Sequence, residues 1–261
     1  KRGYFEEATG SVLRMTGYHE SEEGTEEHSA SAETDWVDDM CTFESFETSV
    51  RKIAIDTGIG TDGFSAYLIR KAPEEERRRY WEAIKTCIKT KSFPDGYREW
   101  IALLALKPGE DPRDLERRRD IWLAAHGQKI VDRLFTEGEY EKVADKQVSC
   151  SQAGWTKKRG PSENAWILRA HKEKCHEERR GCYRGYIDWG TFFMSISREC
   201  MWRVEKASGV RPSVTEVMMN LHEGLTGRYE TAWGLTDKVP IEEGDMQGGI
   251  SSPGRAKLVL T

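Results

Sequence analysis

The sequence predicts an α+β fold, because helical stretches and short hairpin strands follow one another without an internal repeat. Apolar residues recur at three- and four-residue steps in several segments, which is typical of helices with one buried face. Two shorter stretches, Arg98–Leu106 and Arg119–Leu123, indicate strands, and a Lys107-Pro108-Gly109 turn follows the first of them. A further pair, Arg228–Trp233 and Lys238–Ile241, fits a hairpin around residues 234–237.

Residues 1–41 are predicted to form an acidic, disordered lead-in. Residues 16–39 are rich in Glu, Ser, Thr and Gly and poor in apolar side chains, so they bury too little surface to fold. The first 50 residues carry a net charge of −10, and the remaining residues carry +5, which is compatible with a phosphate backbone as partner. Trp36-Val37-Asp38-Asp39 mimics an aromatic-x-Asp-Asp turn, but the acidic surroundings favour a solvated charge run.

Helices are expected on both sides of a glycine-rich loop in the first half of the chain. The loop, Gly58–Phe64, needs backbone conformations that glycine provides. Pro73 suits the first turn of the next helix, and Phe93-Pro94 ends that helix. The apolar residues that mark the three helices are Phe43, Phe46, Val50 and Ile53, then Tyr80, Trp81, Ile84, Cys87 and Ile88, then Ile130, Val131, Leu134 and Phe135.

In the second half, Pro161 is expected to open a long helix that runs to about Arg180. A short strand, Cys182–Asp188, should follow it and end in a carboxylate. Helices are expected over residues 197–207 and along the apolar stripe Val214–Leu225. Ser252-Pro253 has the form of a helix start, with serine as the cap and proline in the first position.

Composition excludes several classes of protein. The longest apolar run, Trp100–Leu106, is seven residues long, far short of a membrane span, so no membrane partner is expected. The sequence shows no leader, and a chain that opens at Lys1 and stops at Thr261 has the character of an excised piece. The protein is expected to be intracellular, in the nucleus.

Six cysteines contain no C-x-x-C pair, so free thiols in a reducing compartment are expected. His171, Cys175, His176 and Cys182 invite a zinc interpretation, since the first two share a helical face. Their spacing is not that of a common zinc site, and a helix carrying scattered His and Cys is the alternative.

An ordered series of motifs covers residues 58–255. It comprises Gly60-Thr61-Asp62-Gly63-Phe64, Phe93–Trp100 with Leu106–Pro112, Arg119-Asp120-Ile121-Trp122-Leu123, Gln152-Ala153-Gly154-Trp155 with Lys158-Arg159-Gly160 and Ser162, Tyr186-Ile187-Asp188-Trp189-Gly190-Thr191-Phe192-Phe193, and Gly244–Pro253. In this order the series resembles the fingers and palm of non-LTR (LINE-like) reverse transcriptases. The resemblance implies a right-hand polymerase fold, with fingers over residues 42–180 and a partial palm over residues 181–261.

The resemblance also implies an activity: RNA-directed DNA polymerisation in the complete protein. The partners would be an RNA template, a DNA primer and deoxynucleoside triphosphates. The chain ends before the family's aromatic-x-Asp-Asp motif, so the fragment alone is expected to be inactive. Nucleotidyl transfer of this kind uses two Mg²⁺ ions, which take hard oxygen ligands such as carboxylates.

The resemblance also assigns roles to individual residues, according to their positions in the motifs. Asp188 would be the catalytic metal ligand, although an Asp that simply ends a strand is the alternative. Lys107 and Arg119 would grip the triphosphate, unless they are solvated surface cations. Phe193 would lie under the 2′ carbon of the sugar, unless it is a packing residue. Gln247 would border the incoming nucleotide, unless it belongs to an ordinary glycine loop.

The basic run of Lys157, Lys158 and Arg159 would touch template phosphates, or it is a plain solvated charge run. Several positions depart from the family pattern: Asp120 replaces proline, Met194 replaces aspartate, Trp155 replaces phenylalanine, and Gly254-Arg255-Ala256 replaces a more apolar run. These departures leave two alternatives open. One is a non-catalytic nucleic-acid-binding remnant, and the other, ranked lower because of residues 111–116, is a group II intron maturase.

Overall fold

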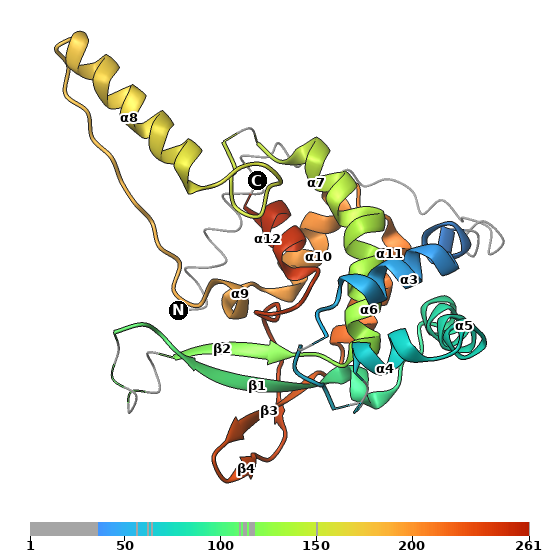
Figure 1. Ribbon diagram of the computed structural model, residues 1–261. Coiled ribbons are helices and arrows are strands. Elements are labelled where there is room, and N and C mark those ends of the chain that lie inside the picture. The colour runs from blue at the N-terminus through green and yellow to red at the C-terminus, as the bar shows by residue number, and fades with distance from the viewer. Residues whose placement is uncertain are drawn as a thin grey trace.

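A computed structural model describes residues 36–260 of the protein, except 56, 62, 64, 110, 112–113, 115–117 and 150. The predicted α+β class is confirmed, because one mixed sheet packs with a group of helices (Figure 1). The acidic lead-in falls outside these residues up to position 35. Residues 36–40 are helical, and the Trp36 and Val37 side chains are buried, so the expectation of disorder is wrong there, whereas Asp38 and Asp39 are exposed as expected.

The sheet has five strands in the order β2-β1-β3-β4, with β5 also paired to β3. The long strands are β1 (Glu99–Leu106), β2 (Arg118–Leu123) and β3 (Thr226–Thr231), and the short ones are β4 (Gly234–Leu235) and β5 (Val239–Pro240). β1 runs antiparallel to β2, with Ala102 opposite Trp122, and parallel to β3. Trp100, Ala102 and Trp122 belong to one buried apolar cluster. The two predicted strands are therefore confirmed. The predicted hairpin is correct only in part: β3 turns back at residues 232–233 into β4, which lies where the turn was expected, and β5 pairs with the first residues of β3.

Helices form the rest of the body and share one apolar core. In chain order they are α3 (Phe43–Lys52), α4 (Ala66–Lys71), α5 (Glu74–Thr90), the 3-10 turn η1 (Asp95–Arg98), α6 (His126–Phe135), a π-helical turn η3 (Thr136–Tyr140), α7 (Glu141–Gln147), α9 (Phe192–Ser195), α10 (Arg198–Ala207), α11 (Pro212–His222) and α12 (Ser252–Val259). Local chemistry starts several of them. Thr42 caps α3 by accepting a hydrogen bond from the Ser45 N–H, and Ser197 caps α10 in the same way.

A helical arm projects from this body (Figure 1). α8 (Pro161–Glu177) begins at the predicted proline, and the Glu163 carboxylate accepts a hydrogen bond from the Gly160 N–H. Residues 181–189 then return from the far end of α8 toward α9 without regular secondary structure. We call residues 161–190 the arm. None of the helices in the described ranges has the length and apolar character of a membrane span.

Two local predictions are wrong. Residues 182–188 form no strand, because no strand of the described part of the chain lies beside them to supply hydrogen bonds. The cap of α12 is Ser251 rather than Ser252, and Pro253 stands one position further into the helix. The Ser252 hydroxyl instead donates a hydrogen bond to Asp245, so it lies inside the fold.

Candidate functional site

The loop formed by residues 244–251 is hydrogen-bonded to two parts of the chain that are remote from it in sequence. The Gly244 N–H donates to the Ile196 carbonyl at 3.0 Å, and the Asp245 N–H donates to the Phe193 carbonyl at 2.8 Å. On the other side, the Trp122 N–H of β2 donates to the Gln247 carbonyl at 2.9 Å. We call this meeting of β2, residues 193–196 and the loop the junction.

Two glycines make the junction possible. Gly244 has a φ of +86°, and a Cβ there would lie 2.7 Å from the backbone of Met194. Gly248 has a φ of +119°, and its Cβ would lie 2.5 Å from the Trp122 carbonyl oxygen. An L side chain at either position would combine an unfavourable backbone conformation with a steric clash. The glycines of this motif therefore allow backbone to approach backbone.

Aromatic rings line one side of the junction. The Phe193 side chain is half-buried, and its ring meets the Trp155 ring edge-on with 5.5 Å between centroids. The neighbouring Phe192 ring lies 5.4 Å away in a similar arrangement. Trp155 comes from the loop before the arm, so a fourth motif stretch, Gln152–Trp155, reaches the same place. Half of the Trp155 side chain remains exposed, at 49%.

Lys107 and Arg119, the two cations expected to bind a triphosphate, lie on or next to the strands β1 and β2. Arg119 is exposed on β2, opposite Ala105, and it precedes Trp122 by three residues. Lys107 follows the last residue of β1 and is half-buried. Within the described part of the chain, neither side chain has an ion-pair partner.

Asp188 does not lie at the end of a buried strand, contrary to the expectation. Residues 181–190 are all exposed, and Asp188 lies on the returning segment of the arm, five residues before Phe193. Among the described residues, one group of metal-ligating side chains is compact enough to hold an ion, and it contains no carboxylate. Asp188 therefore belongs to no cluster of three or more metal-ligating side chains among the described residues.

The basic run already has partners inside the protein. The Lys157 ammonium lies 2.7 Å from the Glu141 carboxylate, which raises the pKa of the lysine. Arg159 donates from Nη1 to the Ser149 carbonyl at 3.5 Å. Lys158 is exposed. A template contact at Lys157 would have to compete with this ion pair.

A buried ionic network lies directly behind the junction, and the sequence did not predict it. The Arg255 side chain is fully buried. Its Nε lies 3.0 Å from Glu205 and its Nη1 lies 3.2 Å from Asp245. The guanidinium also lies over the Trp202 ring, 4.7 Å from the centroid, and its Nη1 is 3.4 Å from Nε2 of His222. A charged side chain buried so deeply requires partners of this kind.

The environment shifts several of these pKa values. Burial raises the pKa of Glu205 in spite of the Arg255 guanidinium. Burial opposes ionisation of Asp245 as well, but the guanidinium and the surrounding hydrogen-bond donors outweigh it, so the pKa of Asp245 is lowered. Burial also lowers the pKa of His222, so this imidazole is neutral at pH 7. Asp132, on α6, has a pKa raised to about 7 by burial.

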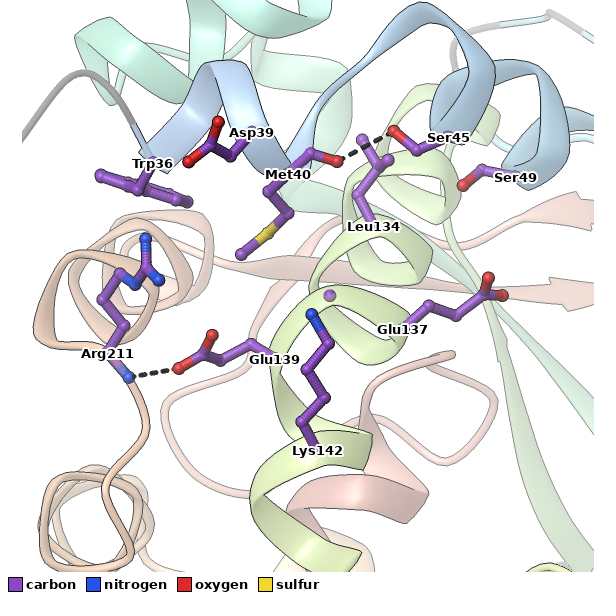
Figure 2. Close-up of a pocket in the computed structure, with 11 residues that line it drawn as sticks. Trp36, Asp39, Met40, Ser45, Ser49, Leu134, Glu137, Glu139, Lys142 and Arg211 are labelled. Carbon is purple, nitrogen blue, oxygen red and sulfur yellow. Dashed lines mark hydrogen bonds between the residues drawn. The ribbon is translucent and has the colours of Figure 1, made fainter.

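Two cavities of the described structure lie away from the junction. One of about 360 Å³ lies between residues 36–49, the α6–α7 region and Arg211 (Figure 2). Its lining is mixed in charge, with Lys142 and Arg211 near Asp39, Glu137 and Glu139 (Figure 2). A second of about 550 Å³ is lined by residues that include Arg198, Trp202 and His222, on the outer side of the ionic network. Neither of the two includes any of the predicted site residues.

The structure thus brings Phe193, Gln247 and β2 together, and it leaves Asp188 and the basic run outside that contact. The network was missed because its members are far apart in sequence: Arg255 lies 50 residues from Glu205 and 33 residues from His222. Comparison with known proteins adds no assignment: no protein-family model matches the chain, and no curated protein is significantly similar to it.

Proposed function

We propose that this chain is part of a reverse transcriptase of the non-LTR retrotransposon type, an RNA-directed DNA polymerase. In this proposal it binds an RNA template, a DNA primer and a deoxynucleoside triphosphate at the junction. Arg119 and Lys107 meet the triphosphate, Gln247 and Phe193 border the nucleotide, and Asp188 is a ligand for Mg²⁺. Lys157, Lys158 and Arg159 contact the template backbone.

The observation that supports the proposal is the junction itself. Motif stretches that carry the resemblance lie more than 50 residues apart in sequence, yet their backbones are hydrogen-bonded to one another. A nucleotide site needs such convergence, because base, sugar and triphosphate must be held at once by different segments. The half-buried Phe193 ring and the exposed Arg119 guanidinium supply an apolar surface and a phosphate-binding group.

The described residues do not by themselves fit a two-ion site. Asp188 offers one exposed carboxylate, whereas two divalent ions need ligands on both sides. The chemistry of the ions would therefore need carboxylates beyond those that the described residues bring together. This same observation favours a second candidate function, in which the chain binds nucleic acid without catalysis.

Nucleotide-dependent binding distinguishes the two functions. A fluorescent RNA–DNA primer-template with a recessed 3′ end is titrated with the chain in Mg²⁺, and anisotropy is recorded. Contacts to phosphate predict an affinity that falls steeply as salt rises. Addition of the complementary deoxynucleotide should tighten binding several-fold, and a mismatched deoxynucleotide should not.

Variants locate the effect. Arg119→Ala and Gln247→Ala should lose the response to the complementary nucleotide, whereas Arg79→Ala, which removes an exposed arginine from α5, should keep it. Binding that ignores the nucleotide in the parent protein would support the non-catalytic function. Failure to bind the primer-template at all would contradict both.

A further inference from the structure

The far end of the arm is held together by few contacts. α8 stands clear of the body, and the returning segment leaves its far end and runs back toward α9 (Figure 1). Arg184 donates a hydrogen bond from this segment back to the Leu168 carbonyl. Exposed apolar side chains such as Trp166, Tyr183 and Ile187 supply little packing there.

One cluster of side chains does connect the two halves of the arm. His171 and Cys175 are one turn apart on α8, so they lie on the same face of the helix. Cys182 approaches them from the returning segment, and its Sγ lies 3.6 Å from Nδ1 of His171. The same nitrogen lies 3.9 Å from Sγ of Cys175. Cys175 is buried at 3% exposure, although the residues around it are exposed.

We propose that His171, Cys175 and Cys182 bind a Zn²⁺ ion that fastens the returning segment to α8. Zn–S bonds of about 2.3 Å and Zn–N bonds of about 2.0–2.1 Å in a tetrahedron place nitrogen and sulfur ligands about 3.6 Å apart. The measured 3.6 and 3.9 Å are close to this separation, and all three ligand atoms lie within 4.8 Å of one another. The ion would therefore fit with only small movements of the side chains.

The ligand set selects the kind of metal. Two sulfurs and an imidazole are soft to borderline ligands, which suit Zn²⁺ and do not suit Mg²⁺. Each thiol gives its proton to solvent as the ion binds, so two protons are released and the affinity rises with pH. A solvent molecule completes the tetrahedron at the exposed side.

The site has a structural consequence for the chain that follows it. Cys182 precedes Asp188 by six residues and Phe193 by eleven. Fixing Cys182 to α8 therefore limits the positions that the returning segment can take on its way to the junction. Unlike the magnesium expected at Asp188, this ion is independent of the proposed polymerase function.

Cobalt provides a direct test. The purified chain, kept reduced, is titrated with Co²⁺ and its absorption spectrum is recorded. One equivalent should produce thiolate-to-cobalt charge-transfer absorption and the visible bands of a tetrahedral ion, and Zn²⁺ should remove both. Competition against a chromophoric chelator then gives the Zn²⁺ affinity.

Four variants decide the ligands. Cys175→Ser, Cys182→Ser and His171→Ala should each weaken Zn²⁺ binding more than about 100-fold, beyond the usual loss of an outer-shell partner. His176→Ala, which removes an exposed imidazole next to Cys175, should bind as the parent does. Cys182 is exposed, so its substitution leaves the body folded, which circular dichroism can verify.

The proposal is overturned if the reduced parent shows no thiolate–cobalt absorption, or if His176→Ala weakens binding as much as His171→Ala. It is also overturned if Cys175 and Cys182 are found joined as a disulfide that reductant opens without any metal uptake. Trypsin gives a second measurement: Zn²⁺ should slow cleavage after Arg184 in the parent and not in Cys182→Ser.

Discussion

Removal of the buried arginine should destabilise the whole fold. Arg255→Met keeps an unbranched apolar stem and removes the charge that lies between Glu205 and Asp245. Both carboxylates are buried, at 1% relative exposure for each residue, so neither can turn to water for compensation. Breaking a buried ion pair in this way costs about 3–5 kcal/mol. A typical domain has about 5–15 kcal/mol of stability in total, so the loss is a large fraction of it.

Urea unfolding followed by tryptophan fluorescence and circular dichroism measures this loss. The matched control is Arg79→Met, which breaks exposed ion pairs with Glu75 and Glu76 and should cost less than about 1 kcal/mol. Adding Glu205→Gln to Arg255→Met should recover part of the stability, because it removes one of the stranded charges. If the stability of Arg255→Met lies within about 1 kcal/mol of that of the control variant, the network does not hold the core as described.

Three other changes test separate parts of the structure. The pKa of Asp132 is raised to about 7 from an ordinary 3.8, so between these two pH values the folded protein keeps this carboxyl protonated and the unfolded protein does not. The free energy of unfolding of the parent should therefore fall as pH rises from about 4 to 7. Asp132→Asn removes this titration, so its stability relative to the parent should rise across the same pH range, by on the order of 4 kcal/mol at about pH 8 in unfolding titrations. Stabilities of parent and variant that change with pH in parallel would contradict the raised pKa. Gly248→Ala should lower the free energy of unfolding by roughly 1–3 kcal/mol, because its Cβ would clash with the Trp122 carbonyl. Gly185→Ala, which has open space around it, should leave the stability unchanged, and equal melting temperatures of the two variants would refute the close approach at Gly248. Phe193→Val should strengthen ribonucleotide binding relative to deoxynucleotide binding in the primer-template assay, because the ring would clash with a 2′-hydroxyl; unchanged selectivity with intact binding would make Phe193 a packing residue.

Much of the local structure could be predicted from periodicity and from helix-starting residues. The apolar stripe that begins at Phe43 and the proline at position 161 both mark helices that form as expected. These signals are local, since a helix makes its hydrogen bonds within its own segment. The strand predicted at residues 182–188 could not form from such local signals. Its side chains are typical of a strand, but a strand needs a neighbour, and the described residues provide none.

The candidate site was predictable to a similar extent. Gln247, Phe193 and the glycine at 248 were assigned from motif order, and they do meet at the junction. The hydrogen bonds that hold Phe193 and Gln247 at the junction are made by their backbone carbonyls, which no motif specifies. The role of Arg255 could not be predicted from the sequence, because Glu205 lies 50 residues away and only the folded chain brings the two together.

Asp245 links the interior of the protein to its candidate site. Its N–H donates to the Phe193 carbonyl, while its carboxylate accepts hydrogen bonds from Ser252 and Arg255. One residue therefore fixes the path of the loop outside and the position of the charge inside. A more apolar side chain at position 255 could fill the same volume, but it would leave the Asp245 carboxylate without its counter-charge. The charge at position 255 is thus coupled to the position of the loop. It follows that a change in the network should move Gln247 relative to β2, whereas changes in the arm should not reach the junction through this route.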